Sequence, residues 1–160
     1  MNIRLATFAD HHAIWSLVEP VIRDGKSYPL PRDLGREGSL SYWFAPDKTV
    51  YVAEKDGQLA GLYYIRPNNQ GPGDHICNCG YVTHRAFRGQ GIATQLCQHS
   101  LKIAREQGYR GMQYNLVVST NAAAVHLWQK MGFEIVGTLP MAFRDPEKGL
   151  VEAYVMFQKL

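Results

Sequence analysis

The segment Arg88-Gly89-Gln90-Gly91 places an arginine and two glycines directly in front of an amphipathic run that begins at Ile92. Glycine is unfavourable inside helices and strands, so such a pair marks backbone that must come close to another group. The first amides of a helix have no acceptor within the helix, and the helix dipole makes that end positive. Arg88 would add a charged donor. These features predict a turn that binds a phosphate group.

The two common nucleotide-binding motifs do not fit this turn. The P-loop requires a Gly-Lys-Ser/Thr sequence, which the chain lacks. The dinucleotide fingerprint requires Gly or Ala where Thr94 stands, and a glycine-rich turn much closer to the amino terminus. The phosphate ligand must therefore belong to another class.

Two motifs resemble one known superfamily. Arg88-Gly89-Gln90-Gly91-Ile92-Ala93 resembles Arg/Gln-x-x-Gly-x-Gly/Ala, the pyrophosphate loop of the GNAT superfamily of acetyl-CoA-dependent N-acetyltransferases. The run Asn121-x-x-Ala124-x-x-Leu127-x-x-x-x-Gly132-Phe133 resembles the second signature of that superfamily, at the expected separation. The order of elements agrees from Ile3 to Phe157, so the resemblance covers nearly the whole chain.

The resemblance implies a site for acetyl-CoA. In this fold the fourth and fifth strands are parallel neighbours that splay apart, and the pantetheine arm enters the gap. The residues expected to contact the cofactor are Val82, Arg88, Gly89, Gln90, Gly91, Ile92, Ala93 and Asn121. Asn121 would bond the pantetheine amide or lie near the acetyl group, and it could equally cap the following helix.

The resemblance also implies where the thioester is polarised. The stretch Cys79-Gly80-Tyr81 would carry a bulge that aims an amide at the thioester oxygen, with Gly80 as the catalytic position. Attack by an amine puts negative charge on that oxygen, and one oriented donor contributes roughly 3 kcal/mol.

Two catalytic positions depart from the superfamily pattern. Trp128 stands where a tyrosine often donates a proton to the leaving thiolate, so it would hydrogen-bond the thiolate, line the pocket or pack in the core. The candidates to replace it as donor are Tyr81, Tyr114 and Tyr154. The fourth strand also lacks the frequent glutamate base, which leaves Asp74, His75 and His84 as candidates. Because an α-amine, with a pKa near ~8, needs less help than a lysine near ~10.4, this absence favours small α-amino acceptors.

Polar residues near the expected cleft predict how the acceptor is bound. The amides of Asn78, Asn115 and Asn121 could orient an amine and a carboxylate, and Arg144 could pair with that carboxylate. The run from Asn115 to Arg144 looks like the branch that acetylates small toxic amines and amino-acid analogues, such as the phosphinothricin-type and fungal azetidine-2-carboxylate-type transferases. The alternatives are a protein or peptide N-acetyltransferase, and a non-catalytic acyl-CoA-binding sensor.

Composition restricts the partners and the compartment. A net charge of +3, without a basic stripe, does not predict nucleic-acid binding. No apolar run reaches the ~20 residues of a membrane span, and the start lacks a secretory signal. Three cysteines do not suggest a disulfide framework, and His75-x-Cys77-x-Cys79 lacks the second pair that structural zinc requires. We therefore expect a cytoplasmic protein without a bound metal, whose last strand could pair across a homodimer.

The elements that must position these residues form one α/β domain over residues 1–160. Periodicity predicts strands at 3–7, 49–55, 58–65, 75–84, 112–118, 133–138 and 151–158, and helices at 10–24, 33–44, 91–107 and 121–131. With the resemblance, this order implies a mixed, mostly antiparallel seven-stranded sheet with a splayed parallel pair, strands 4 and 5, and four helices.

Overall fold

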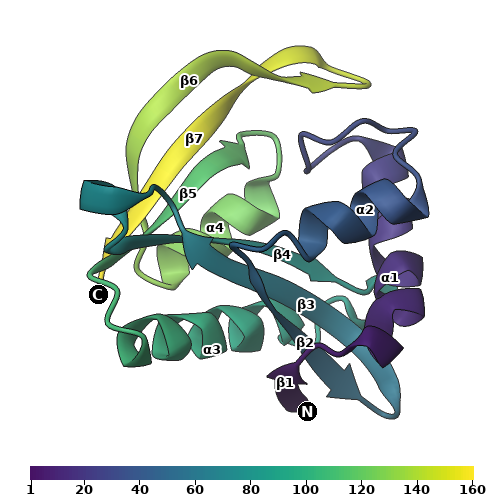
Figure 1. The fold of residues 1–160 in the computed structure, drawn as a ribbon. Coiled ribbons are helices and arrows are strands. Elements are labelled where there is room, and N and C mark those ends of the chain that lie inside the picture. Colours follow the sequence, from purple (N-terminus) through teal and green to yellow (C-terminus); the bar gives the residue numbers. More distant parts are fainter.

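The computed structural model describes residues 1–160 and confirms the α/β fold with a single seven-stranded sheet (Figure 1). Its strands run in the order β1-β2-β3-β4-β5-β7-β6, and only β4 and β5 are parallel. The strands are β1 (Asn2–Leu5), β2 (Thr49–Lys55), β3 (Gln58–Pro67), β4 (Ile76–Thr83), β5 (Gly111–Val118), β6 (Glu134–Asp145) and β7 (Gly149–Lys159). The four helices are α1 (His11–Asp24), α2 (Arg36–Trp43), α3 (Ile92–Glu106) and α4 (Ala122–Lys130).

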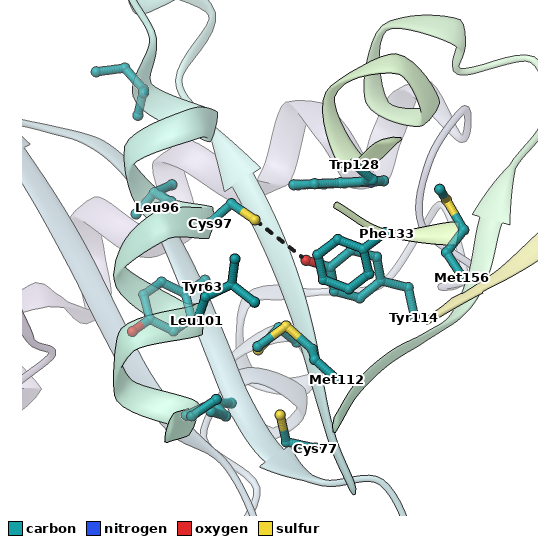
Figure 2. Close-up of a cluster of buried hydrophobic side chains, with 14 of the residues drawn as sticks. Tyr63, Cys77, Leu96, Cys97, Leu101, Met112, Tyr114, Trp128, Phe133 and Met156 are labelled. Atoms are coloured by element: carbon teal, nitrogen blue, oxygen red, sulfur yellow. Dashed lines mark hydrogen bonds between the residues drawn. The ribbon is translucent and has the colours of Figure 1, made fainter. Parts of the chain in front are cut away.

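The two faces of the sheet carry separate hydrophobic cores. Helix α1 buries one apolar stripe, including Ile14 and Val18, against β2 and β3 on the face that it shares with α2. Helices α3 and α4 bury Leu96, Cys97 and Trp128 on the opposite face (Figure 2). Because side chains alternate along a strand, successive residues of β4 point into different cores.

Strands β4 and β5 remain paired over a short distance only. Their register joins Ile76 to Gly111 and Cys77 to Met112 and then stops. Beyond this point the side-chain amide of Asn78 donates to the carbonyl of Gln113 at 2.9 Å, in place of the next ladder bond. The strands then diverge, which leaves backbone groups of β4 without a partner on this side.

The predicted bulge in β4 is wrong. Strand β4 pairs with β3 in an unbroken antiparallel register from Gly61 opposite Thr83 to Pro67 opposite Cys77. Gly80 is needed instead for close packing, since a Cβ there would lie 2.6 Å from Cε1 of Tyr64. The register shift beside the splay lies in β5, between Tyr114 and Val117 relative to β7.

Strand β6 is longer than the sequence pattern predicted. It continues to Asp145, through register shifts against β7 and a left-handed Met141 with φ of 54°. Arg144, which was expected in a loop, therefore lies on this strand. The β6–β7 hairpin curves away from the rest of the sheet, and its tip approaches the connection between α1 and α2 (Figure 1).

Candidate active site

The glycine turn before α3 forms a cradle of unpaired amides. Gly89 and Gly91 both adopt left-handed backbone, with φ of 73° and 75°. The first helical hydrogen bond is donated by Gln95 to the carbonyl of Gly91 at 3.1 Å. The amides that donate to no protein acceptor are those of Gly89, Gly91, Ile92, Ala93 and Thr94. A phosphate group fits this chemistry, because these donors and the positive end of α3 are already fixed in place.

One arginine beside the cradle has no partner in the protein. Arg88 is exposed, and it forms no ion pair and no side-chain hydrogen bond. By contrast, the guanidinium of Arg85 contacts Asp24 at 3.1 Å. Gln90 accepts a hydrogen bond from Lys55, whose ammonium is a second cation near the turn. Arg88 is thus the cation that remains available to an anion in the cradle.

A cleft of about 790 Å³ runs from the cradle along the splay between β4 and β5. It ends among the aromatic side chains of Tyr28, Tyr42 and Tyr64. The residues expected from the sequence that line it are Asn78, Gly80, Tyr81, Val82, Arg88, Gly89, Ala93, Tyr114, Asn115, Asn121 and Trp128. Those that do not are Asp74, His75, His84, Gln90, Gly91, Ile92, Arg144 and Tyr154. Arg144 is exposed on β6, away from this lining.

Alternation along β4 decides which of its amides face the splay. The amide of His84 donates to the carbonyl of Ala60, and the amide of Asn68 donates to the carbonyl of Ile76. With the register of β3 and β4, these two bonds show that the even-numbered residues of β4 form the hydrogen-bonded pairs with β3. The amides of Gly80 and Val82 therefore point toward β3. The odd-numbered residues Cys79, Tyr81 and Thr83 present their amides and carbonyls to the cleft.

The connection between α1 and α2 reaches this edge through one side chain. The hydroxyl of Tyr28 donates to the carbonyl of Tyr81 at 2.9 Å. A Cβ at Gly80 would lie 3.0 Å from the same hydroxyl oxygen. Burial raises the pKa of Tyr28 well above its usual value, so this group stays a neutral donor. Tyr28 therefore closes one side of the cleft over the β4 edge.

Asn78 uses its polar atoms within the protein. It is 5% exposed, and its Oδ1 accepts from the hydroxyl of Tyr64 at 3.2 Å and from Nε of Arg66 at 3.4 Å. Its amide nitrogen donates to Gln113. Asn115 is exposed and joins Gln113 and Asn68, at 3.0 and 2.8 Å.

Asn121 begins α4 and lines the cleft at the same time. Its Oδ1 accepts from the amide of Ala124 at 3.4 Å, so the side chain caps the helix. The side-chain NH₂ group donates to no protein acceptor. Asn121 can therefore cap α4 and still offer a donor to a ligand.

Trp128 covers a buried hydroxyl network. Its ring centroid lies 4.9 Å from that of Tyr81 and 5.1 Å from that of Tyr114. Figure 2 shows Trp128 beside Tyr114. The hydroxyl of Tyr81 lies 2.7 Å from Oγ of Ser100 and 2.9 Å from the hydroxyl of Tyr114. Ser100 donates to the carbonyl of Cys97 at 2.8 Å.

The donors and acceptors of this network show which hydroxyl donates in each hydrogen bond. Because Ser100 donates to a carbonyl, it accepts from Tyr81, and Tyr81 in turn accepts from Tyr114. Burial raises the pKa of both tyrosines well above the usual value. Both hydroxyl hydrogens are thus committed inside the core, and the network leaves none for a leaving group in the cleft.

The cleft offers little to a general-base mechanism. Asp24 is the one carboxylate in its lining, and it contacts Arg85. The candidates Asp74, His75 and His84 lie outside the lining. Nδ1 of His84 accepts from the amide of Ala86 at 3.1 Å. No three metal-ligating side chains converge, and Cys77, Cys79 and Cys97 are buried free thiols.

Tyr64 and Arg66 are cleft residues that sequence reasoning missed. They are two positions apart on β3, so they point to the same face of the sheet. That spacing was visible in the sequence, but their contacts with Asn78 arise only from the pairing of β3 with β4.

Comparison with known proteins identifies the family. Residues 12–133 match the model of the acetyltransferase (GNAT) family. The chain belongs to this family. No helix of this GNAT protein combines the length and hydropathy of a membrane span. The chain is similar in structure to a GCN5-related N-acetyltransferase from Kribbella flavida, with a TM-score of 0.93 and 35% identity over 99% of this chain and 97% of that one.

Relatives of this GNAT acetyltransferase differ in their acceptors. It is 28% identical to the N-acetyltransferase aca1 of Schizosaccharomyces pombe, over 84% of this chain and 72% of the relative. It is 38% identical to an L-methionine sulfoximine/L-methionine sulfone acetyltransferase of Pseudomonas paraeruginosa, over 38% of each. Two others are described as N-alpha-acetyltransferases. Membership thus gives acetyl transfer from acetyl-CoA and leaves the acceptor open.

Proposed function

We propose that this GNAT enzyme transfers an acetyl group from acetyl-CoA to the amine of a small molecule, an amino acid or an analogue. The observation that carries the proposal is the cleft itself. It is continuous with the amide cradle at one end and ends among Tyr28, Tyr42 and Tyr64 at the other. An aromatic-lined cleft of about 790 Å³ has the size and lining of a small-molecule site.

The cradle and the β4 edge would hold acetyl-CoA, which supplies an activated acetyl group. In this proposal Arg88 and the amides from Gly89 to Thr94 hold the pyrophosphate. The backbone of β4 and the side-chain NH₂ of Asn121 hold the pantetheine arm. Val82 would line this arm through its side chain.

The amide that polarises the thioester would belong to a neighbour of Gly80, the residue expected from the sequence. Since the amide of Gly80 faces β3, we assign the donor to the neighbouring amide of Tyr81 or Cys79. Gly80 remains essential because a larger residue would displace Tyr64 and Tyr28. Trp128 would wall the pocket on the opposite side. Catalysis then consists of positioning and polarisation, with direct attack in a ternary complex.

The acceptor amine must lose a proton without an adjacent carboxylate. Asp24 is engaged by Arg85, so water is the proton carrier that remains. The α-amine of a peptide has a pKa of about 8 and the lysine amine one of about 10.4. The α-amine of a free amino acid, next to a carboxylate, lies between the two, so it supplies more neutral form near neutral pH than lysine does. The relative that acetylates methionine analogues agrees with a small acceptor of this kind.

A peptide N-terminus is the second candidate acceptor. The relatives described as N-alpha-acetyltransferases favour it. Against it, Lys26 and Glu147 form an ion pair at 2.8 Å, which joins the α1–α2 connection to the tip of the β6–β7 hairpin. That contact holds the two segments together beside Asp24 and Ser27, which line the cleft, so it would obstruct a polypeptide there.

Thiol release from acetyl-CoA tests the proposal against its rivals. The panel would contain amino acids, amino-acid analogues, small amines and short peptides. We expect turnover with small amines. Turnover on peptides alone would replace the proposed acceptor with a peptide. Silence across the panel, with acetyl-CoA still bound in calorimetry, would support an acyl-CoA sensor.

A further inference from the structure

The geometry points to Arg66 as the residue that selects an acceptor with a carboxylate next to its amine. This inference rests on the proposed function and names the chemistry of its acceptor. Arg66 lines the cleft where β4 and β5 separate, whereas the arginine expected from the sequence, Arg144, lies outside it. Asn78, which was expected to bind substrate, becomes a positioning residue for Arg66.

Arg66 is held in place by a buried partner. Its Nε donates to Oδ1 of Asn78 at 3.4 Å, and Asn78 is fixed in turn by Tyr64 and by the carbonyl of Gln113. One Nη contacts Asp47 at 3.3 Å, and the other has no protein acceptor. An arginine held through Nε keeps donors free for a planar anion.

Positive charge exceeds negative charge at this end of the cleft. Lys48 lies behind two rings that line the cleft, with its ammonium 3.3 Å from the ring centroid of Tyr42 and 4.5 Å from that of Tyr64. It donates to the carbonyl of Tyr42 at 2.6 Å and forms no ion pair. Asp47 is the one carboxylate that contacts either cation, and its side chain is half exposed. Two cations therefore lie near one solvated carboxylate, which leaves an excess of positive charge here.

The position of Arg66 suits an anion close to the reacting amine. Arg66 pairs with Asn78 across β3 and β4, one residue beyond the last ladder pair of β4 and β5. The amides of Cys79 and Tyr81, which we assign to the thioester, are the next ones along this edge. An acceptor anchored at Arg66 through a carboxylate would thus present its α-amine toward the same edge.

Matched acceptors with and without charge test this inference. Each amino acid that is turned over would be compared with its primary amide, which keeps the amine and loses the carboxylate. For the unsubstituted enzyme we expect kcat/KM to favour the acid by about 10-fold or more. In Arg66→Gln the KM for the acid should rise about 10- to 100-fold, while the KM values for the amide and for acetyl-CoA stay unchanged.

Arg144→Gln is the matched control, since it removes an arginine from outside the cleft. It should leave the preference for acids intact. Asn78→Asp should weaken acid acceptors as well, because a fixed carboxylate would compete for Arg66. Calorimetry of the amino acid with CoA-saturated protein gives a second readout, in which Arg66→Gln should lose the heat of binding.

The outcomes separate this inference from the proposed function. The role of Arg66 would be overturned if Arg66→Gln lowered the turnover of acids and amides equally. It would also be overturned if Arg144→Gln selectively lost turnover of acids. Either result would leave small-amine acetylation standing. If no small amine is turned over or bound, the role of Arg66 and the proposed function are both overturned. A selective loss of acids in Arg66→Gln alone supports both.

Discussion

The side-chain amide of Asn78 donates to the carbonyl of Gln113 at 2.9 Å, where β4 and β5 part. This bond replaces a ladder bond with a side-chain bridge, so the splay begins at a defined residue. The same asparagine accepts from Tyr64 and Arg66. One buried side chain thus links the architecture of the sheet to the acceptor end of the cleft.

Replacing Asn78 by leucine should weaken the fold and the site together. Gln113 would lose the donor and Tyr64 the acceptor that Asn78 supplies. We expect the free energy of unfolding, measured in urea, to be about 1–3 kcal/mol lower than for the unsubstituted protein. Asn115→Ala, an exposed position on β5, should change this free energy by about 0.5 kcal/mol or less. Equal effects of the two substitutions would contradict the bridge.

Gly91→Val should impair binding of acetyl-CoA. Valine disfavours the left-handed backbone of Gly91, so the cradle amides would be displaced. We expect the Kd measured by calorimetry to rise about 10-fold or more. Gly57→Val is the control, because Gly57 has the same φ of 75° in the β2–β3 turn. It should lower stability and leave the Kd unchanged; an unchanged Kd in folded Gly91→Val would rule out the cradle.

Trp128→Phe should retain most activity if Trp128 acts as a wall. Phenylalanine keeps a ring against Tyr81 and Tyr114 and lacks the indole N–H. We expect kcat to stay within about threefold, since loss of a general acid typically costs at least about 100-fold. A fall of that size in steady-state thiol release, with stability maintained, would assign Trp128 to the chemistry.

Lys48 should make acceptor binding depend on pH. Burial lowers the pKa of Lys48 to about 8, with Arg66 adding to the effect and Asp47 opposing it. The rings of Tyr42 and Tyr64 face the same ammonium. The charge is therefore present below pH 8 and lost above it, so the KM for a carboxylate acceptor should rise as pH passes 8.

Lys48→Met separates this effect from titration of the acceptor amine. The amine titrates in the same way with both proteins, so the ratio of their KM values isolates Lys48. That ratio should change near pH 8 and level off above it. A ratio that is constant from pH 6 to 10 would remove Lys48 from acceptor binding.

The parts of this protein that depend on local backbone could be predicted from sequence. Gly89 and Gly91 are left-handed in the fold, and helix α3 begins where the amphipathic run begins. The extension of β6 was missed because register shifts and Pro140 interrupt its alternation.

Positions that depend on pairing between distant strands could not be predicted in this way. The direction of the Gly80 amide follows from the phase of the β3–β4 ladder, which the sequence of β4 does not contain. Arg66 meets Asn78 through that same pairing. The prediction from sequence placed the carboxylate-binding arginine at Arg144, outside the cleft. Contact across strands decides which arginine faces the cleft, and the sequence does not contain it.

The unpaired amides before α3 also bear on the choice of buffer. Five fixed N–H donors and the free Arg88 do not distinguish the pyrophosphate of coenzyme A from a small inorganic oxyanion. Phosphate and sulfate should therefore act as competitors of acetyl-CoA. Affinities measured in phosphate buffer would understate those in a buffer without phosphate or sulfate, and crystals grown from sulfate would carry an occupied cradle.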